Sequence, residues 1–335
     1  MARLCTQMSP LLQENILDKL HCRKIFTVID ILQENTEKLV EITKLPYRDI
    51  IQLRQSIVAY YAAFPRKGID IYNEVMSYTA LIPTGIESLD NIIEGGLMTG
   101  KVYEVCGPSG SGKTQLCLTI STHIANCYKQ QVHYIDTKAD FSGMRVEEML
   151  TSCGYLDEVI GAVMERIRVT RIGNIYELFN LLHHFKSNVH SEQDELQSVR
   201  IIILDSLPIL FFPFLGKNLN DGFGLMNQLA NVIKHIVTEC HVAFVIVNLA
   251  MQWIEEEHST NEGHSGYLPQ EEVVFTCDTV KPALGKYWLD VPCTRLYIHK
   301  IDSREKRQLF IMKSTILTTK KYCRVSVNSQ GIMSA

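Results

Sequence analysis

The chain has 335 residues, of which 46% are hydrophobic and 21% are charged, so it is long enough for one large core and a small additional domain. Its 33 basic and 37 acidic residues are nearly balanced, which excludes a globally basic nucleic-acid-binding protein and leaves only local patches for such contacts. The 10 cysteines have no CxxC spacing, and no apolar stretch approaches the roughly 20 residues of a membrane span, so we expect a reduced, soluble, intracellular protein.

The first part of the chain has the pattern of a small helical bundle. Apolar residues recur at helical spacing in two runs, from Leu11 to Leu20 and from Ile50 to Val58, and Pro46 breaks the stretch between them. We therefore predict a helical N-terminal domain over residues 1–63.

A linker is predicted over residues 64–83. It begins with PRKG at 65–68 and continues as IDIYNEVMSYTALIP, which is rich in Ile, Tyr, Val and Thr. Because β-branched and aromatic residues favour strands, this composition predicts an extended segment.

From Thr84 onward, strand and helix patterns alternate. The strand candidates with helical stretches between successive pairs are 101–106, 131–136, 166–169, 200–204 and 242–247. Such alternation predicts crossover connections and a mainly parallel sheet. The candidates that follow without intervening helices, and that are predicted to extend the sheet antiparallel, are 295–300, 308–313 and 323–327.

A phosphate-binding loop is predicted at GPSGSGKT (107–114), between the strand KVYEVC and an apolar helix. Backbone N–H groups and the helix N-terminus would surround the phosphates of a bound nucleotide. The residues predicted to bind ATP are Gly107, Pro108, Ser109, Gly110, Ser111, Gly112, Lys113, Thr114 and Gln115. Lys113 is expected to contact the β- and γ-phosphates, and Thr114 is expected to bind Mg²⁺.

Three other strand ends carry polar residues. RIIILDS (200–206) ends a buried strand in Asp205, which would be the second Mg²⁺ ligand, or else a cap of the next segment. VIVN (245–248) ends in Asn248, whose amide would sense the γ-phosphate or a catalytic water, or else simply end the strand. VHYIDTKADF (132–141) places Lys138 just after a strand, where catalytic groups of such proteins lie. A lysine there can hold a phosphate, but it cannot readily take a proton from water. The predicted catalytic set is Lys113, Asp205 and Asn248.

The phosphate loop and the polar strand ends, in their order along the chain, resemble those of the RecA-like recombinases, and among them the eukaryotic Rad-fifty-one branch. Residues 84–118 are similar almost position by position to that branch's entry into its ATPase core, and YIDT, IIILDS, VIVN and TRLYI follow in the family's order. Residues 63–75 and KPALGKYW (281–288) resemble the D-type paralogues. The X-ray-cross-complementing paralogue is a poor match because it lacks the helical N-terminal domain. The resemblance implies an α/β RecA-like P-loop ATPase core with a mainly parallel sheet over residues 84–335.

The resemblance also implies a function. It indicates an ATP-binding subunit of a nuclear paralogue complex that assists homologous recombination and double-strand-break repair. The implied partners are C-type and X-ray-cross-complementing-type paralogues and, weakly, single-stranded or branched DNA; no membrane partner is expected. In this family an extended linker adds a strand to a neighbouring subunit's sheet, and here its pocket-filling side chains would be Tyr72, Val75, Tyr78 and Ala80. The alternative is an active DNA-dependent ATPase recombinase that forms filaments on single-stranded DNA; a small-molecule kinase is less consistent, since no arginine-rich lid follows the core strands.

Departures from the family pattern favour the first function. Active members carry a water-activating glutamate at the position of Lys138, and a general base contributes on the order of 10²–10⁴-fold. We therefore expect weak ATP hydrolysis, with Lys138 either stabilising bound ATP or turning to solvent. Lys313 is a candidate for a contact in the neighbour's site, or for a solvated strand end.

The family's DNA-facing loops also depart from the pattern. The first (207–224) has Lys217 as its only basic residue, and its phenylalanines would either stack on bases or pack in a core or interface; they are Phe211, Phe212 and Phe214. The second, from Ala250 to Val280, has acidic residues and no Lys or Arg, which is the wrong charge for phosphate. DNA contact is therefore predicted at basic residues elsewhere, which solvated surfaces explain equally well: His21, Arg23, Lys24, Lys44, Arg48, Arg54, Arg304, Lys306, Arg307, Lys320, Lys321 and Arg324.

Overall fold

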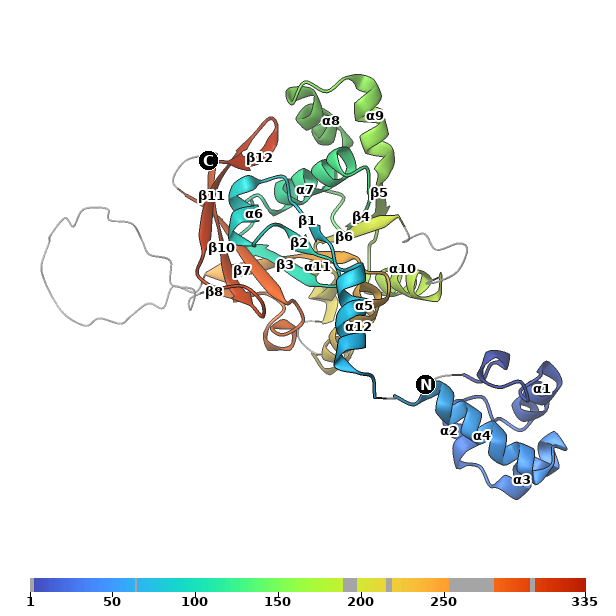
Figure 1. The fold of residues 1–335 in the computed structure, drawn as a ribbon. Helices are drawn as coiled ribbons and strands as arrows, with labels where there is room; N and C mark the ends of the chain where they lie inside the picture. Colours follow the sequence, from blue (N-terminus) through green and yellow to red (C-terminus); the bar gives the residue numbers. More distant parts are fainter. Residues whose placement is uncertain (1–2, 64, 189–197, 215–218, 253–279, 302–304) are drawn as a thin grey trace, which may run out of the picture. The chain divides into compact units, whose positions relative to one another are not determined.

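The computed structural model describes residues 3–63, 65–188, 198–214, 219–252, 280–301 and 305–335 (Figure 1). The chain forms two compact units, Met1–Glu74 and Val75–Ala335. The boundary at residue 63 and the separate linker over 64–83 remain predictions. None of the helices within the described ranges is long and apolar enough to cross a membrane.

The smaller unit is helical, as its apolar spacing predicts. Its helices are α1 (Glu14–Cys22), α2 (Val28–Gln33), α3 (Thr36–Thr43) and α4 (Tyr47–Tyr61), preceded by the 3-10 turn η1 (Thr6–Met8). Thr27 and Asp30 form a capping box at the start of α2. Arg54 of α4 donates hydrogen bonds to the backbone carbonyls of Ile31 and Glu34 and to the Thr36 hydroxyl, so this predicted DNA contact instead joins α4 to α2 and α3.

Most of the segment predicted to be extended is a helix, α5 (Gly68–Tyr78), so the prediction is wrong for that part. Near its end, Leu81–Ile82 form the short strand β1, which pairs antiparallel with β2 (Leu97–Met98). A strand needs a neighbouring strand to pair its backbone N–H and C=O groups, whereas a helix pairs them within the segment. Asp70 lies in the first turn, where an acidic residue stabilises the helix N-terminus. None of the α5 side chains is buried.

The larger unit is built on a 10-stranded sheet in the part of the chain that the structure describes. The strands along the sheet are, in spatial order, β12 (Gly331–Ser334), β11 (Tyr322–Asn328), β10 (Lys306–Ser314), β9 (Thr294–Lys300), β3 (Val102–Gly107), β7 (Ala243–Gln252), β6 (Val199–Asp205), β4 (Gln131–Asp136) and β5 (Ile167–Arg171), with β8 (Val280–Pro282) paired to β7. The predicted mainly parallel sheet is confirmed, because β9, β3, β7, β6, β4 and β5 run parallel.

One later strand departs from the prediction. β10, β11 and β12 extend the sheet antiparallel, whereas β9 pairs parallel with β3, so the antiparallel prediction for 295–300 is wrong on that side. The sequence pattern could not decide this point, because a long chain segment connects β7 to β9 and lets β9 return in either direction.

Helices cover both faces of the sheet (Figure 1). The remaining helices are α6 (Glu87–Ile92), α7 (Lys113–Cys127), α8 (Gly143–Ser152), α9 (Asp157–Arg166), α10 (Ile175–Asn188), α11 (Pro208–Phe211) and α12 (Leu219–Glu239). Successive strand residues point to opposite faces. In β6, Ile201 and Ile203 therefore pack in the core with α7, while Ile202 and Leu204 pack in the core with α10 and α12.

The segment predicted as the first DNA-facing loop is largely helical where it is described. After Asp205 the chain forms α11 and the 3-10 turn η2 (Phe212–Phe214) before α12 begins. Phe211 is fully buried and belongs to the core, whereas Phe212 is 48% exposed. Lys217 and residues 253–279 of the predicted second loop lie outside the described residues.

Candidate functional site

The predicted phosphate loop connects the end of β3 at Gly107 to the start of α7 at Lys113. Gly112, the residue before α7, has a φ of 110°, a backbone conformation that residues other than glycine rarely adopt. A Cβ at Gly107 would lie 2.2 Å from the carbonyl oxygen of Ile298 on β9. These two glycines are therefore required by the backbone path that brings the loop over the sheet.

Lys113 is held inside this loop. Its Nζ donates hydrogen bonds to the carbonyl oxygens of Gly107, at 2.9 Å, and Pro108, at 2.6 Å. Burial lowers the pKa of Lys113 to about 8, and the positive charge of Lys138 contributes to the shift. The two lysines line one pocket, so two ammonium groups lie in one small region.

Thr114 and Asp205 lie together, as a shared metal site requires. The Thr114 hydroxyl donates to Oδ2 of Asp205 at 2.6 Å, and the Tyr134 hydroxyl donates to the same oxygen at 2.9 Å. Within the described structure, Oδ1 of Asp205 is buried without a hydrogen-bond partner. A hydroxyl and a carboxylate with a spare oxygen are ligands that suit Mg²⁺, so these residues fit the metal.

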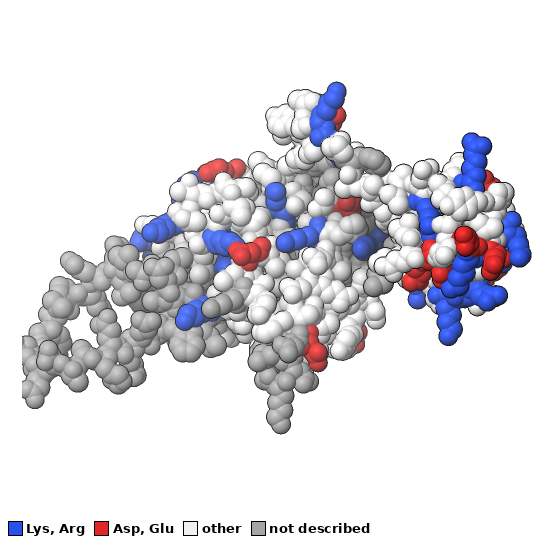
Figure 2. Space-filling view, turned by 90° about the horizontal axis from the view of Figure 1, so that it is seen from below, with Lys and Arg blue, Asp and Glu red and all other residues white. Residues whose placement is uncertain are grey.

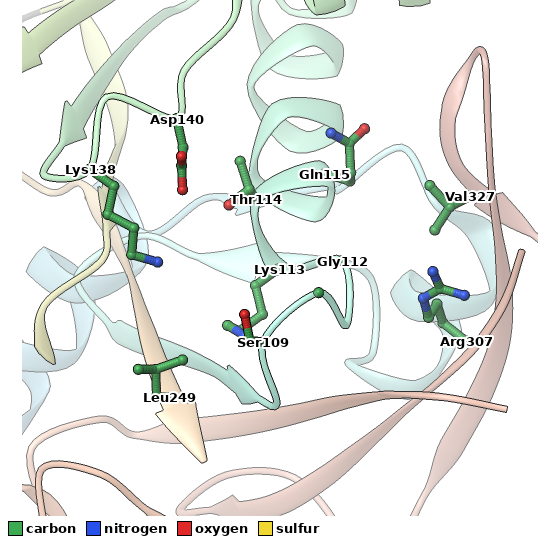
Figure 3. Close-up of a pocket in the computed structure, with 11 residues that line it drawn as sticks. Ser109, Gly112, Lys113, Thr114, Gln115, Lys138, Asp140, Leu249, Arg307 and Val327 are labelled. Carbon is green, nitrogen blue, oxygen red and sulfur yellow. The ribbon is translucent and has the colours of Figure 1, made fainter. Parts of the chain in front are cut away.

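A pocket opens above the loop, and Figure 3 shows its lining. The lining residues are Ser109, Gly110, Gly112, Lys113, Thr114, Gln115, Lys138, Asp140, Leu249, Arg307 and Val327. Lys138, Asp140 and Leu249 lie on one side of the phosphate loop, and Arg307 and Val327 lie on the other (Figure 3). Lys138 and Asp140 lie on the loop after β4, and Leu249 of β7 pairs with Gly107 at the carboxyl end of β3, so this group lies at the edge of the parallel sheet where ligands bind.

Lys138 faces this pocket, so the structure favours the interpretation in which it contacts a ligand over the one in which it turns to solvent. The buried carboxylate of Asp136 organises its loop. It accepts hydrogen bonds from the backbone N–H groups of Lys138 at 3.1 Å, Asp140 at 3.2 Å and Phe141 at 3.1 Å. Asp140 was not among the predicted site residues; it lies two positions past Lys138 and lines the same pocket.

Asn248 does not line the pocket. Its side chain is fully buried, and Nδ2 donates a hydrogen bond to the carboxylate of Glu104 on the adjacent strand β3. The next residue, Leu249, lines the pocket instead, because neighbouring residues of a strand point to opposite sides. The geometry therefore argues against a phosphate-sensing amide at position 248. Glu104 could have indicated this arrangement from the sequence, because a carboxylate inside an apolar strand needs buried hydrogen-bond partners.

Two predicted basic DNA contacts, and the lysine predicted to reach a neighbour's site, have other structural roles or lie outside the described residues. Arg307 on β10 is buried, and its Nε donates to the carbonyl of Ser111 at 2.9 Å, so it supports the phosphate loop. Lys313, the candidate for a neighbour's site, donates to the Leu289 carbonyl at 2.6 Å and to the Asp290 carboxylate at 2.5 Å within its own chain. Arg304 is outside the described residues.

Comparisons with known proteins agree with this architecture. The Rad51 family model matches residues 76–335, and a model described as RAD51D, N-terminal domain, matches residues 1–59. The chain is 31% identical to the DNA repair protein RAD51 homolog 4 of Bos taurus, over 88% of this chain and 85% of that protein. It is 31% identical to the Mus musculus protein of the same name, over 89% of this chain and 84% of that protein.

The chain also matches proteins at lower identity. The DNA repair protein RAD51 homolog 2 of Homo sapiens is 25% identical over 91% of this chain and 83% of that protein. A crystal structure of the RadB recombinase superposes with a TM-score of 0.56 at 18% identity, covering 76% of this chain and all of that chain. At this level of identity, the structural similarity supports the RecA-like recombinase fold alone.

Proposed function

The chain belongs to the Rad51 family, and we propose that it is an ATP-binding subunit of a recombinase-paralogue complex that assists homologous recombination and double-strand-break repair in the nucleus. The relatives that match nearly its whole length are named as DNA repair proteins. The observation that carries the proposal is the pocket, which brings residues of the phosphate loop together with a lysine from the loop after β4 and a leucine of β7.

ATP would bind with its phosphates in the loop and with Mg²⁺ at Thr114 and Asp205. Lys113 is already within the loop and needs only to exchange its carbonyl partners for phosphate oxygens. The metal would neutralise charge on the β- and γ-phosphates. Tyr134 holds Asp205 in place through the oxygen that also accepts the Thr114 hydroxyl, which leaves Oδ1 for the metal or its waters.

Hydrolysis of this ATP is proposed to be weak. Where active members carry a water-activating glutamate, a γ-phosphate in the loop would face Lys138, which is a phosphate ligand rather than a base, and the nearby strand β7 presents Leu249, which offers no hydrogen bond to a water. The extra cation would favour the bound triphosphate. Nucleotide would thus serve mainly to hold the protein in its assembly-competent form.

Partners are proposed to dock on α5. This helix buries none of its side chains, and six of its large apolar residues are exposed: Ile69, Ile71, Tyr72, Val75, Met76 and Tyr78. A row of exposed apolar residues of this size marks an interaction surface. We propose C-type and X-ray-cross-complementing-type paralogues as the partners, with the segment remaining helical or pairing as a strand once a neighbouring sheet is present.

DNA is proposed to be a weak ligand of the smaller unit. His21, Arg23, Lys24, Lys44 and Arg48 are exposed there, whereas Arg54 is occupied inside the unit. Figure 2 shows basic side chains gathered on this unit among acidic ones, which is consistent with modest affinity rather than a strong phosphate clamp.

The test is co-expression with candidate paralogues, with and without ATP, combined with ATPase measurements on the isolated chain. We expect co-purification that ATP strengthens, measurable ATP binding, and slow turnover that single-stranded DNA stimulates little. Strong DNA-stimulated turnover by the isolated chain would support the alternative, an active filament-forming recombinase. Absence of ATP binding would contradict both functions.

A further inference from the structure

We propose that Asp140 is the catalytic base of this chain: its carboxylate accepts the proton of the water that attacks the γ-phosphate. This inference rests on the proposed binding of ATP in the pocket. It assigns the slow hydrolysis to a residue two positions beyond Lys138, on the same loop after β4.

The composition of the pocket singles out Asp140. Among the described residues that line it, Asp140 is the one carboxylate, and none is a histidine. Asp205 does not line the pocket, and its Oδ2 already accepts hydrogen bonds from the Thr114 and Tyr134 hydroxyls. A base for water must be a proton acceptor within reach of the γ-phosphate, and carboxylate and imidazole are the usual groups.

The backbone holds Asp140 in that position. Asp136, which is 1% exposed, accepts hydrogen bonds from the N–H groups of Lys138, Asp140 and Phe141, so one buried carboxylate fastens the whole turn. Between Lys138 and Asp140, Ala139 has a φ of 60°, a left-handed conformation that reverses the chain. The reversal allows residues 138 and 140 to line one pocket.

The side chains are arranged for a water at the phosphate end. Figure 3 shows the Asp140 carboxylate between Lys138 and Thr114, on the side of the phosphate loop where Leu249 also lies. Thr114, which donates a hydrogen bond to Asp205, lies on the side of the pocket where Mg²⁺ would bind. The positive charge of Lys138 offsets the repulsion that Asp140 alone would exert on a triphosphate.

The proposed step transfers the γ-phosphoryl group of ATP to water. The oxygen of water forms a bond to the γ-phosphorus, and the bond between that phosphorus and the β–γ bridging oxygen breaks, with its electron pair leaving on ADP. The water proton passes to the Asp140 carboxylate, which later releases it to solvent. The products are ADP and inorganic phosphate.

The experiment compares the full-length wild-type chain with Asp140→Asn and Asp140→Glu. Affinity is measured with a fluorescent, non-hydrolysable ATP analogue and Mg²⁺, and hydrolysis is measured under single-turnover conditions. In Asp140→Asn we expect the rate to fall by about tenfold or more, because the amide of Asn cannot accept the water proton. Affinity should be unchanged or a few-fold tighter, because a negative charge is removed. Asp140→Glu should retain part of the rate.

Glu147→Gln, which neutralises an exposed carboxylate on α8 away from the pocket lining, is the matched control and should behave as wild type. In Lys138→Glu, where a second carboxylate is present, adding Asp140→Asn should cost much less than in the wild-type chain.

Three results would overturn the assignment of Asp140. The first is a wild-type rate equal to that of Asp140→Asn, which includes the case in which neither protein hydrolyses ATP. The second is a loss of ATP affinity in Asp140→Asn that parallels its loss of rate. The third is a loss of rate in the Glu147→Gln control equal to that in Asp140→Asn. Failure of the wild-type chain to bind the analogue would instead overturn the proposed function, so the two failures are distinguishable.

Discussion

The side-chain amide of Asn248 donates a hydrogen bond to the buried carboxylate of Glu104. Arg295 of β9 forms an ion pair with the other carboxylate oxygen, and its guanidinium also donates to the Trp288 carbonyl at 3.5 Å. One carboxylate therefore connects the three adjacent strands β9, β3 and β7, of which β3 leads into the phosphate loop. It also explains why Leu249, rather than Asn248, faces the pocket.

Glu104→Ala is expected to destabilise the protein strongly. Removing one partner of a buried ion pair leaves the other charge uncompensated, which typically costs about 3–5 kcal/mol. Arg295 would be that charge, because its side chain is 4% exposed. Chemical denaturation followed by circular dichroism measures the loss. Glu147→Ala, at an exposed position on α8, should change stability by less than about 0.5 kcal/mol; an equally small effect of Glu104→Ala would contradict the role of the network.

Lys113→Ala and Asp205→Ala should each remove most Mg²⁺-dependent ATP binding. The first removes the ammonium that faces the phosphates, and the second removes the carboxylate that holds Thr114 and would bind the metal. Lys113→Arg should weaken binding without abolishing it, because the charge is kept but the compact ammonium is lost. Isothermal titration calorimetry with ATP and Mg²⁺ tests all three, and wild-type affinity in both alanine variants would refute the site.

Lys138→Glu should raise ATP turnover by about tenfold, part of the 10²–10⁴-fold that a general base contributes. The new carboxylate would lie at the end of β4, in the pocket that Lys138 now lines. ATP affinity should fall, because a positive charge near the phosphates becomes negative. Steady-state phosphate release measures the rate. Identical behaviour of Lys138→Ala and Lys138→Glu would show that this side chain does not act on the γ-phosphate.

Tyr72→Ser combined with Met76→Ser should reduce co-purification with a partner paralogue at least tenfold while leaving the chain folded. These side chains are 59% and 60% exposed on α5, so their loss should change stability by less than about 0.5 kcal/mol. Tyr47→Ser, at a 59% exposed position on α4, is the matched control and should assemble normally.

Point substitutions test this surface better than deletion of residues 65–82. Leu81 and Ile82 pair with β2 (Leu97–Met98), and Ile82 is buried in the core of the larger unit. A deletion would therefore disturb folding as well as assembly. Wild-type co-purification by the folded double variant would exclude α5 as the docking surface.

The local features of this protein follow from the sequence alone. The phosphate loop is a contiguous motif whose glycines and lysine act through neighbouring backbone, so it is evident without knowledge of the rest of the fold. The buried strands are short apolar runs, and their alternation with helices predicts the parallel sheet because right-handed crossovers leave few other arrangements. The position of Asp205 beside the phosphate loop could also be predicted, because the carboxyl ends of parallel strands lie at the same edge of the sheet.

Tertiary structure alone decided which side chains enter the pocket. Glu104 and Asn248 are 144 positions apart, so no local pattern shows that the carboxylate turns the amide inward and leaves Leu249 at the site. Asp140 reaches the pocket only because Asp136 fastens the turn and Ala139 reverses it. Arg307 supports the loop from β10, far along the chain. The orientation of a side chain depends on contacts between distant strands, and these contacts exist only after the chain has folded.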